Sequence, residues 1–183
     1  MNSFGSLFTF CVLGIFWLAT PLGAERLPAP NQLPKLPTGT RPLTRNSGYE
    51  FAGTVKAIEH VTATGRGVGT TRITFYVDAA VRGVHTGQTF VIAEWAGLWE
   101  SREQYRVGER VFLFLYPLSK LGLTSPVQGS GGRFRITGND RVVVRRDQKG
   151  ILPERIARTI GDRAEIDLSE LAGALRMADK ELP

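Results

Sequence analysis

The stretch Thr71-Arg72-Ile73-Thr74-Phe75-Tyr76-Val77-Asp78-Ala79-Ala80-Val81-Arg82 decides the fold class of this chain. Its apolar and polar residues alternate with a period of two, which is the period at which side chains return to the same face of an extended strand. Ile73, Phe75 and Val77 share one side, and the residues between them are mainly polar. The alternation predicts a strand over 71–82 with one buried face and one face toward water.

Shorter segments of the same kind flank this strand. The run Arg110–Tyr116 is apolar on both faces, as expected of a strand enclosed on both sides, and Pro117 ends it. The other predicted strands are 51–60, 89–95, 132–137 and 141–145, and glycine-rich or polar turns separate them. We therefore predict a mainly β fold, a small antiparallel OB-like β-barrel over residues 48–146. The residues expected to interlock inside it are Phe75, Val77, Val111, Leu113 and Phe134.

Beyond the strands, the pattern changes to that of a helix. Asp167-Leu168-Ser169-Glu170 has the spacing of a capping box, and apolar residues follow it at helical intervals. This predicts an α-helix near 168–178 within a C-terminal extension, residues 147–183, that packs on the barrel. The segment 153–164 stays open, because its isoleucines fit a helical spacing and Gly161-Asp162 interrupts it.

The first 24 residues have the composition of an export signal. They contain no Asp, Glu, Lys or Arg, and an apolar run precedes Pro21-Leu22-Gly23-Ala24. These features predict a secretory signal peptide, 1–24, cleaved after Ala24, with an uncleaved anchor as the alternative. Residues 25–47 hold five of the ten prolines and predict a proline-rich linker. No later stretch is apolar for long enough to span a membrane, so we expect an exported protein, periplasmic or secreted.

The composition narrows the possible chemistry. The chain carries 23 Lys and Arg against 17 Asp and Glu, a formal net charge of +6, and all of these residues follow Ala24. Outside the cytoplasm, the natural anionic partners are envelope polymers and acidic protein surfaces, so nucleic acid is not expected. Cys11 is the only cysteine, and His60 and His85 are the only histidines. A disulfide scaffold and a cysteine-rich zinc site are excluded, and we expect no cofactor.

Four groups of residues carry a resemblance to known proteins. They are Phe51–Val55, then Phe75–Val77 with Val81-Arg82-Gly83 and Gly87, then Val107–Leu115, and finally Gln128–Ile136. Together they resemble uncharacterised exported bacterial proteins whose barrel is similar to the OB-like fold of the netrin module and of the tissue inhibitors of metalloproteinases. The resemblance covers residues 49–145 and implies a fold, not a reaction. Those inhibitors place an N-terminal cysteine on the protease zinc, and this chain has no such cysteine at its mature start, so that mechanism does not carry over.

Carboxylates beside tryptophan offer one enzymatic alternative. Glu94, Glu100 and Glu103 lie close in sequence to Trp95 and Trp99, and an acid–base pair beside sugar-stacking rings would suit a small secreted hydrolase. Solvated loop carboxylates are the simpler interpretation, because nearness in sequence does not bring two carboxyl groups together in a cleft. A protease-regulating module without the zinc-binding cysteine is a further alternative.

The segment that follows residues 89–94 is a candidate binding surface. It contains Trp95, Trp99 and Tyr105, and large rings in a long loop commonly provide interface contacts. Packing of these rings over one end of the barrel is the alternative.

A second candidate surface is basic. Arginines alternate with apolar residues in two predicted strands, so they share one outward face if the strands pair. They are Arg133, Arg135, Arg141 and Arg145. A solvated basic face without a ligand is the alternative. The sequence thus favours an exported, non-enzymatic binding or interaction module of the cell envelope, with a protein or an anionic envelope polymer as its partner.

Overall fold

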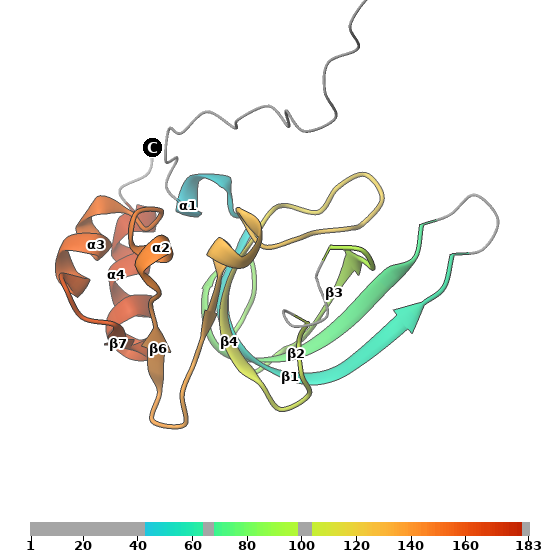
Figure 1. Ribbon diagram of the computed structural model, residues 1–183, viewed down its shortest axis with the longest axis horizontal. Helices are drawn as coiled ribbons and strands as arrows, with labels where there is room; N and C mark the ends of the chain where they lie inside the picture. The colour runs from blue at the N-terminus through green and yellow to red at the C-terminus, as the bar shows by residue number, and fades with distance from the viewer. Residues whose placement is uncertain (1–42, 64–67, 99–103, 181–183) are drawn as a thin grey trace, which may run out of the picture. The chain divides into compact units, whose positions relative to one another are not determined.

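The computed structural model describes residues 43–63, 68–98 and 104–180. All of them belong to one compact unit, Gly39–Pro183. This unit is mainly β with a C-terminal helix, as the sequence predicts (Figure 1). The predicted signal peptide, 1–24, and residues 25–42 of the predicted linker lie outside the described residues. No helix in the described part of the chain is long and apolar enough to cross a membrane.

Strands β1, β2 and β3 form an antiparallel meander. β1 (Tyr49–Val61) and β2 (Thr70–Arg82) are long, and β3 (Thr89–Trp95) is shorter. β2 pairs with both neighbours, and its alternation buries Ile73, Phe75 and Val77 as predicted. The turn after β2 requires Gly83, because its φ is +73° and an added Cβ would lie 2.4 Å from the Gly48 carbonyl oxygen.

The sheet continues on the other side of β1. β4 (Arg110–Leu115) pairs with β1, and β5 (Arg133–Arg135), which follows the short 3-10 helix η1 (Gly129–Gly132), pairs with β4. The resulting order is β3-β2-β1-β4-β5, with β3 and β5 at the two ends. Among the described residues no ladder joins these ends, so the predicted closure of the sheet into a barrel stays a prediction.

Strand β4 separates two hydrophobic clusters, which is why it is apolar on both faces. Val111 and Leu113 pack in one cluster with Phe75, whereas Phe112 and Phe114 pack in the other with the C-terminal elements. The expected interior set is wrong in one member. Phe134 lies in the second cluster, with its ring centroid 5.7 Å from that of Phe114.

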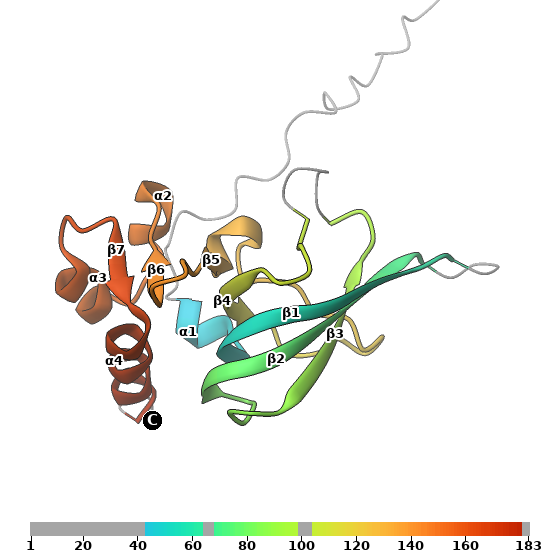
Figure 2. The ribbon, with the colours of Figure 1, turned by 90° about the horizontal axis from the view of Figure 1, so that it is seen from below.

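The C-terminal elements form a second small sheet and three helices. β6 (Arg141–Val143) pairs with β7 (Glu165–Asp167). The helices are α2 (Arg146–Lys149), α3 (Glu154–Ile160) and α4 (Leu168–Lys180). In both ribbon views these elements group together, away from β3 (Figures 1 and 2). α3 resolves the segment 153–164 as a helix that ends at Gly161, whose φ is +56°.

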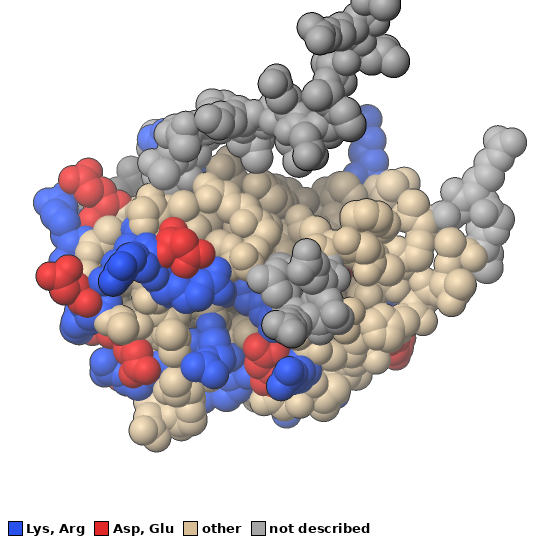
Figure 3. Space-filling view, viewed as in Figure 1, with Lys and Arg blue, Asp and Glu red and all other residues tan. Residues whose placement is uncertain are grey.

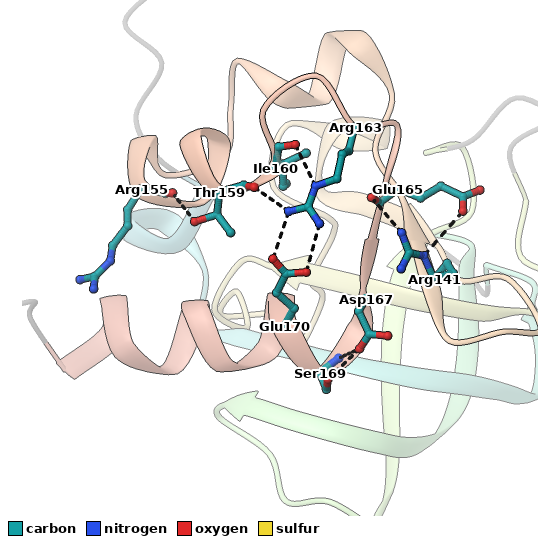
Figure 4. Close-up of polar contacts among 9 residues, drawn as sticks. All are labelled: Arg141, Arg155, Thr159, Ile160, Arg163, Glu165, Asp167, Ser169 and Glu170. Carbon is teal, nitrogen blue, oxygen red and sulfur yellow. Dashed lines mark hydrogen bonds and ion pairs between the residues drawn. The ribbon is translucent and has the colours of Figure 1, made fainter.

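Helix α4 begins where the sequence predicts, with half of a capping box. Asp167 Oδ1 accepts a hydrogen bond from Ser169 N at 2.9 Å, whereas Glu170 pairs with Arg163 at 3.0 Å (Figure 4). Hydrogen bonds from Ser169 lower the pKa of Asp167. Arg163 also donates to the carbonyl of Thr159 at 2.6 Å, so it joins the end of α3 to the start of α4.

The last residues of the predicted linker, 43–47, belong to the described fold. Helix α1 (Leu43–Asn46) belongs to it, because Leu43 is fully buried in the cluster beneath the C-terminal helices. Arg82 connects helix α1 to strand β2, since its Nη1 donates a hydrogen bond to the Thr44 carbonyl at 2.6 Å.

Arg82 also faces two carboxylates. Its guanidinium pairs with Asp179 near the end of α4 and lies 3.5 Å from Glu50 Oε1. Glu50 is fully buried, and Ser47 Oγ donates to it, but Glu50 Oε2 has no hydrogen-bond partner among the described residues. Burial raises the pKa of Glu50, more than the hydrogen bond from Ser47 and the charge of Arg82 lower it.

Candidate binding groove beside strand β3

The alternation of β3 turns Trp95 toward solvent. Ile92 and Glu94 face the buried side of the sheet, beside Ile73 and Thr71 of β2. Val91 and Trp95 face the other way, and 48% of Val91 and 54% of Trp95 are exposed. One of the predicted aromatic binding residues is therefore displayed at the end of a strand.

A loop that follows β4 folds back beside this end of β3 (Figure 1). Tyr116 N donates to the Ser125 carbonyl at 3.0 Å, and Thr124 Oγ1 donates to the Tyr116 carbonyl at 2.7 Å, so the two ends of the loop are joined. Thr124 N donates to the Ala93 carbonyl at 2.9 Å. This bond ties the loop to β3, and the loop and the strand become two neighbouring walls.

A groove of about 280 Å³ lies between these walls. Its lining is mainly apolar, with one aromatic ring from each wall and hydroxyl groups from the loop. The lining includes Trp95, Leu98, Tyr116, Pro117, Leu123 and Thr124. In the same loop, Leu118 and Leu121 are 49% and 78% exposed. Exposed apolar surface rimmed by polar groups is typical of interaction sites. We call this surface the β3 groove.

The Trp95 ring occupies its position because Gly97 has no side chain. Leu98 N donates to the Trp95 carbonyl at 3.0 Å, which closes a turn after β3. A Cβ on Gly97 would lie 2.7 Å from two carbons of the Trp95 indole. The indole therefore lies against this glycine, and a larger residue would push it away.

Tyr105, also predicted as a binding residue, is buried and not displayed. Its ring lies edge-on to that of Phe75, with centroids 5.6 Å apart, and its hydroxyl donates to Glu94 Oε1 at 3.4 Å. Burial, and then the nearby Glu94 carboxylate, raise the pKa of Tyr105 well above its ordinary value. Tyr105 is thus a neutral hydrogen-bond donor inside the sheet. Trp99 lies outside the described residues.

Arg133 is directed inward, so the expectation that it lies on an outward basic face is wrong. In the β4–β5 ladder Arg133 stands opposite Leu113, and side chains of a cross-strand pair share one face. Its guanidinium lies 4.1 Å from the centroid of the Tyr105 ring and bonds both carboxylate oxygens of Glu109 at 2.8 Å. Arg133 therefore closes the end of the cluster that contains Phe75.

The other predicted arginines lie on a surface of mixed charge. Arg135 is exposed, Arg145 pairs with Asp147 at 3.2 Å, and Arg141 lies 3.8 Å from Glu165. The two strands expected to pair are joined by one bridge, between Ile136 and Val142, and by a hydrogen bond from Thr137 N to the Arg141 carbonyl at 2.8 Å, while β6 pairs with β7. Figure 3 shows basic and acidic side chains interspersed over the C-terminal elements, while the part near the loop after β4 is mainly uncharged.

The carboxylates of the hydrolase alternative do not form an accessible pair in the described part of the chain. Glu94 is fully buried, and Glu100 and Glu103 lie outside the described residues. His60 Nδ1 lies 3.3 Å from Thr71 Oγ1, and His85 lies in the turn after β2. Within the described ranges, no group of three or more His, Cys, Asp or Glu side chains could hold a metal ion.

No family model matches the chain, and neither a curated protein nor a solved structure matches it. The residues and their contacts are therefore the basis for assigning a function.

The loop wall of the β3 groove was not predicted. Pro117 was interpreted only as the end of a strand, yet it lines the groove together with Tyr116. A signal was present in the sequence: three leucines, Leu118, Leu121 and Leu123, fall within a segment whose Ser119 and Gly122 otherwise indicate a turn. Apolar residues in a surface loop suggest a contact surface.

Proposed function

We propose that this chain is an exported, non-enzymatic binding module of the cell envelope and that it holds a protein partner in the β3 groove. The observation that carries the proposal is the exposure of two aromatic residues in one groove, 54% for Trp95 and 38% for Tyr116. Large rings in a partly desolvated hollow are the commonest anchors of protein interfaces. An apolar lining suits a protein better than an anionic polymer.

The remaining contacts support binding more than catalysis. The one described carboxylate of the hydrolase hypothesis, Glu94, is enclosed and bonded to Tyr105, so a substrate would not reach it without rearrangement. In the predicted basic face, Arg133 forms an ion pair with Glu109, and Arg145 forms one with Asp147. Paired charges attract a distant polyanion weakly, because the field of each pair falls off within a short distance.

The proposal includes an OB-like barrel as the scaffold of the groove. The Thr124–Ala93 hydrogen bond and the bridge between Leu115 and Pro126 support it, because they place the loop after β4 between β4 and β3. Only beside Ala93 would this loop close the barrel that the resemblance to exported OB-like proteins implies. Export itself rests on the signal peptide at residues 1–24, and N-terminal sequencing of the mature protein would find Glu25 first.

Site-specific photo-crosslinking in the native host tests the function. A photoreactive amino acid replaces Leu121, which is 78% exposed in the loop wall, or Arg146 in α2 as the matched position on the charged surface. We expect a discrete protein adduct from position 121 that Trp95→Ala removes and that a paired Arg135→Gln, Arg145→Gln variant leaves intact. Adducts from position 146 alone, or no adduct from position 121, would overturn the proposal.

A further inference from the structure

Strand β3 presents half of its backbone groups to the outside of the sheet. Gln88 and Ala96 use their backbone groups toward β2, because the Gln88 carbonyl accepts from Val77 N at 2.9 Å and Ala96 N donates to the Gly69 carbonyl at 2.9 Å. In a strand these directions alternate with each residue, so the groups of Val91 and Ala93 point away from β2. Among the described residues, Thr124 N bonds to this edge at the Ala93 carbonyl and Leu98 N bonds to it at the Trp95 carbonyl, and the outward groups of Val91 make no backbone hydrogen bond.

Apart from the loop that contacts it at Ala93, this edge lacks the features that usually prevent further strand pairing. Natural edge strands carry Lys or Pro, or they are short or bulged. β3 contains no Lys, Arg or Pro, its one charged residue, Glu94, is buried, and Val91 is 48% exposed. The opposite edge of the sheet is different, because β5 has three residues and two of them are arginines, Arg133 and Arg135.

We infer that an extended peptide segment of the partner protein adds to the outer edge of β3 as a further strand and places a side chain in the β3 groove. This inference rests on the proposed function and specifies how the partner binds. Strand addition supplies main-chain hydrogen bonds to both outward groups of Val91 and to the outward N–H of Ala93, and the groove selects the side chain. The bond from Thr124 N to Ala93 shows that this edge accepts such a contact.

The charges near the edge specify the composition of the peptide. Lys56 Nζ lies 5.6 Å from the centroid of the Tyr76 ring, and Tyr76 stands opposite Thr89 at the start of β3. Lys120 is exposed in the loop wall, and neither lysine makes an ion pair with a described residue. The only carboxylate on β3 itself is buried. The matching peptide therefore alternates apolar with acidic residues.

Fluorescence anisotropy with a defined probe tests the inference on the full mature chain. The probe is a capped, labelled octapeptide of alternating valine and aspartate. The first control is a pair of N-methylated versions of the same peptide. In an extended peptide alternate amides point to opposite edges, and each version carries N-methyl groups on one of these two sets. The methyl groups remove the hydrogen bonds of that edge and keep the side chains. The second control replaces its aspartates with lysines. We expect at least tenfold weaker binding for one N-methylated version and for the lysine peptide.

Two protein variants complete the test. Val91→Pro removes the outward N–H, a change that an edge strand tolerates because that group makes no ladder bond. Val91→Glu places at the edge a charge that repels the acidic probe and leaves the backbone unaltered, in case the proline variant fails to fold. We expect at least a tenfold loss of probe affinity in either variant that folds.

The outcomes separate the inference from the proposed function. Equal binding of the parent and both N-methylated peptides, with a loss in Trp95→Ala, would retain the groove and overturn strand addition. No binding of any peptide would also overturn it, while the crosslinks from position 121 test the groove independently. Concentration-dependent dimerisation that Val91→Glu abolishes would identify a second copy of this chain as the occupant and overturn the peptide partner.

Discussion

Replacing Phe75 with alanine tests the core that supports β3. Phe75 is fully buried, and its ring makes edge-on contacts with Phe51 and Tyr105, each with centroids 5.6 Å apart. Truncating a buried phenylalanine typically lowers the free energy of unfolding by ~3–5 kcal/mol, and each aromatic contact adds ~0.5–1.5 kcal/mol beyond burial. We therefore expect a loss in the upper part of the range, about 4–5 kcal/mol.

Urea denaturation of the mature protein, followed by circular dichroism, measures this loss. The matched control is Tyr76→Ala, the next residue along β2, whose side chain lies on the opposite face and is 42% exposed. Its contact with Lys56 is a surface one, so the free energy of unfolding should fall by less than about 1 kcal/mol. If Phe75→Ala does not fold at all, Phe75→Leu leaves a smaller cavity and permits the same comparison.

Two results would refute the reasoning about Phe75. A loss below about 1 kcal/mol would place Phe75 outside a packed core. A larger loss in Tyr76→Ala than in Phe75→Ala would mean that the β2 register is shifted by one residue, which exchanges the two faces of the strand.

Three further predictions follow from single contacts. Burial raises the pKa of Glu50 above 4.5, so ionisation of Glu50 lowers the stability of the fold as the pH rises. The Glu50→Gln variant should therefore unfold at a higher urea concentration than the wild type at pH 7. This difference should vanish below pH 4.5, where Glu50 is protonated in both the folded and the unfolded protein. The opposite order at pH 7 would mean that the attraction of Arg82 outweighs burial. Asp167→Ala should be less stable than the wild type at pH 7, because hydrogen bonds lower the pKa of Asp167. The difference in stability should shrink progressively as the pH falls below 3.8, and a difference that does not shrink in acid would contradict this cause. Gly97→Ala should displace the Trp95 indole and weaken crosslinking from position 121 while leaving the urea midpoint nearly unchanged, and unchanged crosslinking would show that the ring position is unimportant.

Local periodicity was sufficient to predict the elements that depend on neighbouring residues. The alternation over 71–82 predicted β2 and its buried face, and the apolar run from Arg110 predicted β4, which is enclosed on both sides. Asp167 and the apolar spacing after it predicted α4. In each case one segment contains the whole pattern, so the prediction needs no knowledge of distant partners.

The errors concern faces and partners, which distant segments determine. Period-two alternation shows that Arg133 and Arg135 share a face, but only the pairing of Arg133 with Leu113 shows which face it is. Phe134 enters the second cluster for the same reason. β7, with three residues, Glu165–Asp167, is too short to give a periodic signal. The site was half predicted, because Trp95 was identified and the loop that forms the other wall was not.

The exposed tryptophan and the buried carboxylate depend on each other through the register of β3. Glu94 and Trp95 are adjacent, so a shift of one residue would expose the carboxylate and bury the indole. Glu94 accepts the Tyr105 hydroxyl, and the ring of Tyr105 packs against Phe75 and beneath the Arg133 guanidinium. These contacts favour the register that directs Trp95 outward. The residues predicted for binding therefore divide into two roles. Trp95, the last residue of β3, forms part of the proposed binding surface together with the outer edge of that strand, whereas Tyr105 and Arg133 hold β3 in position.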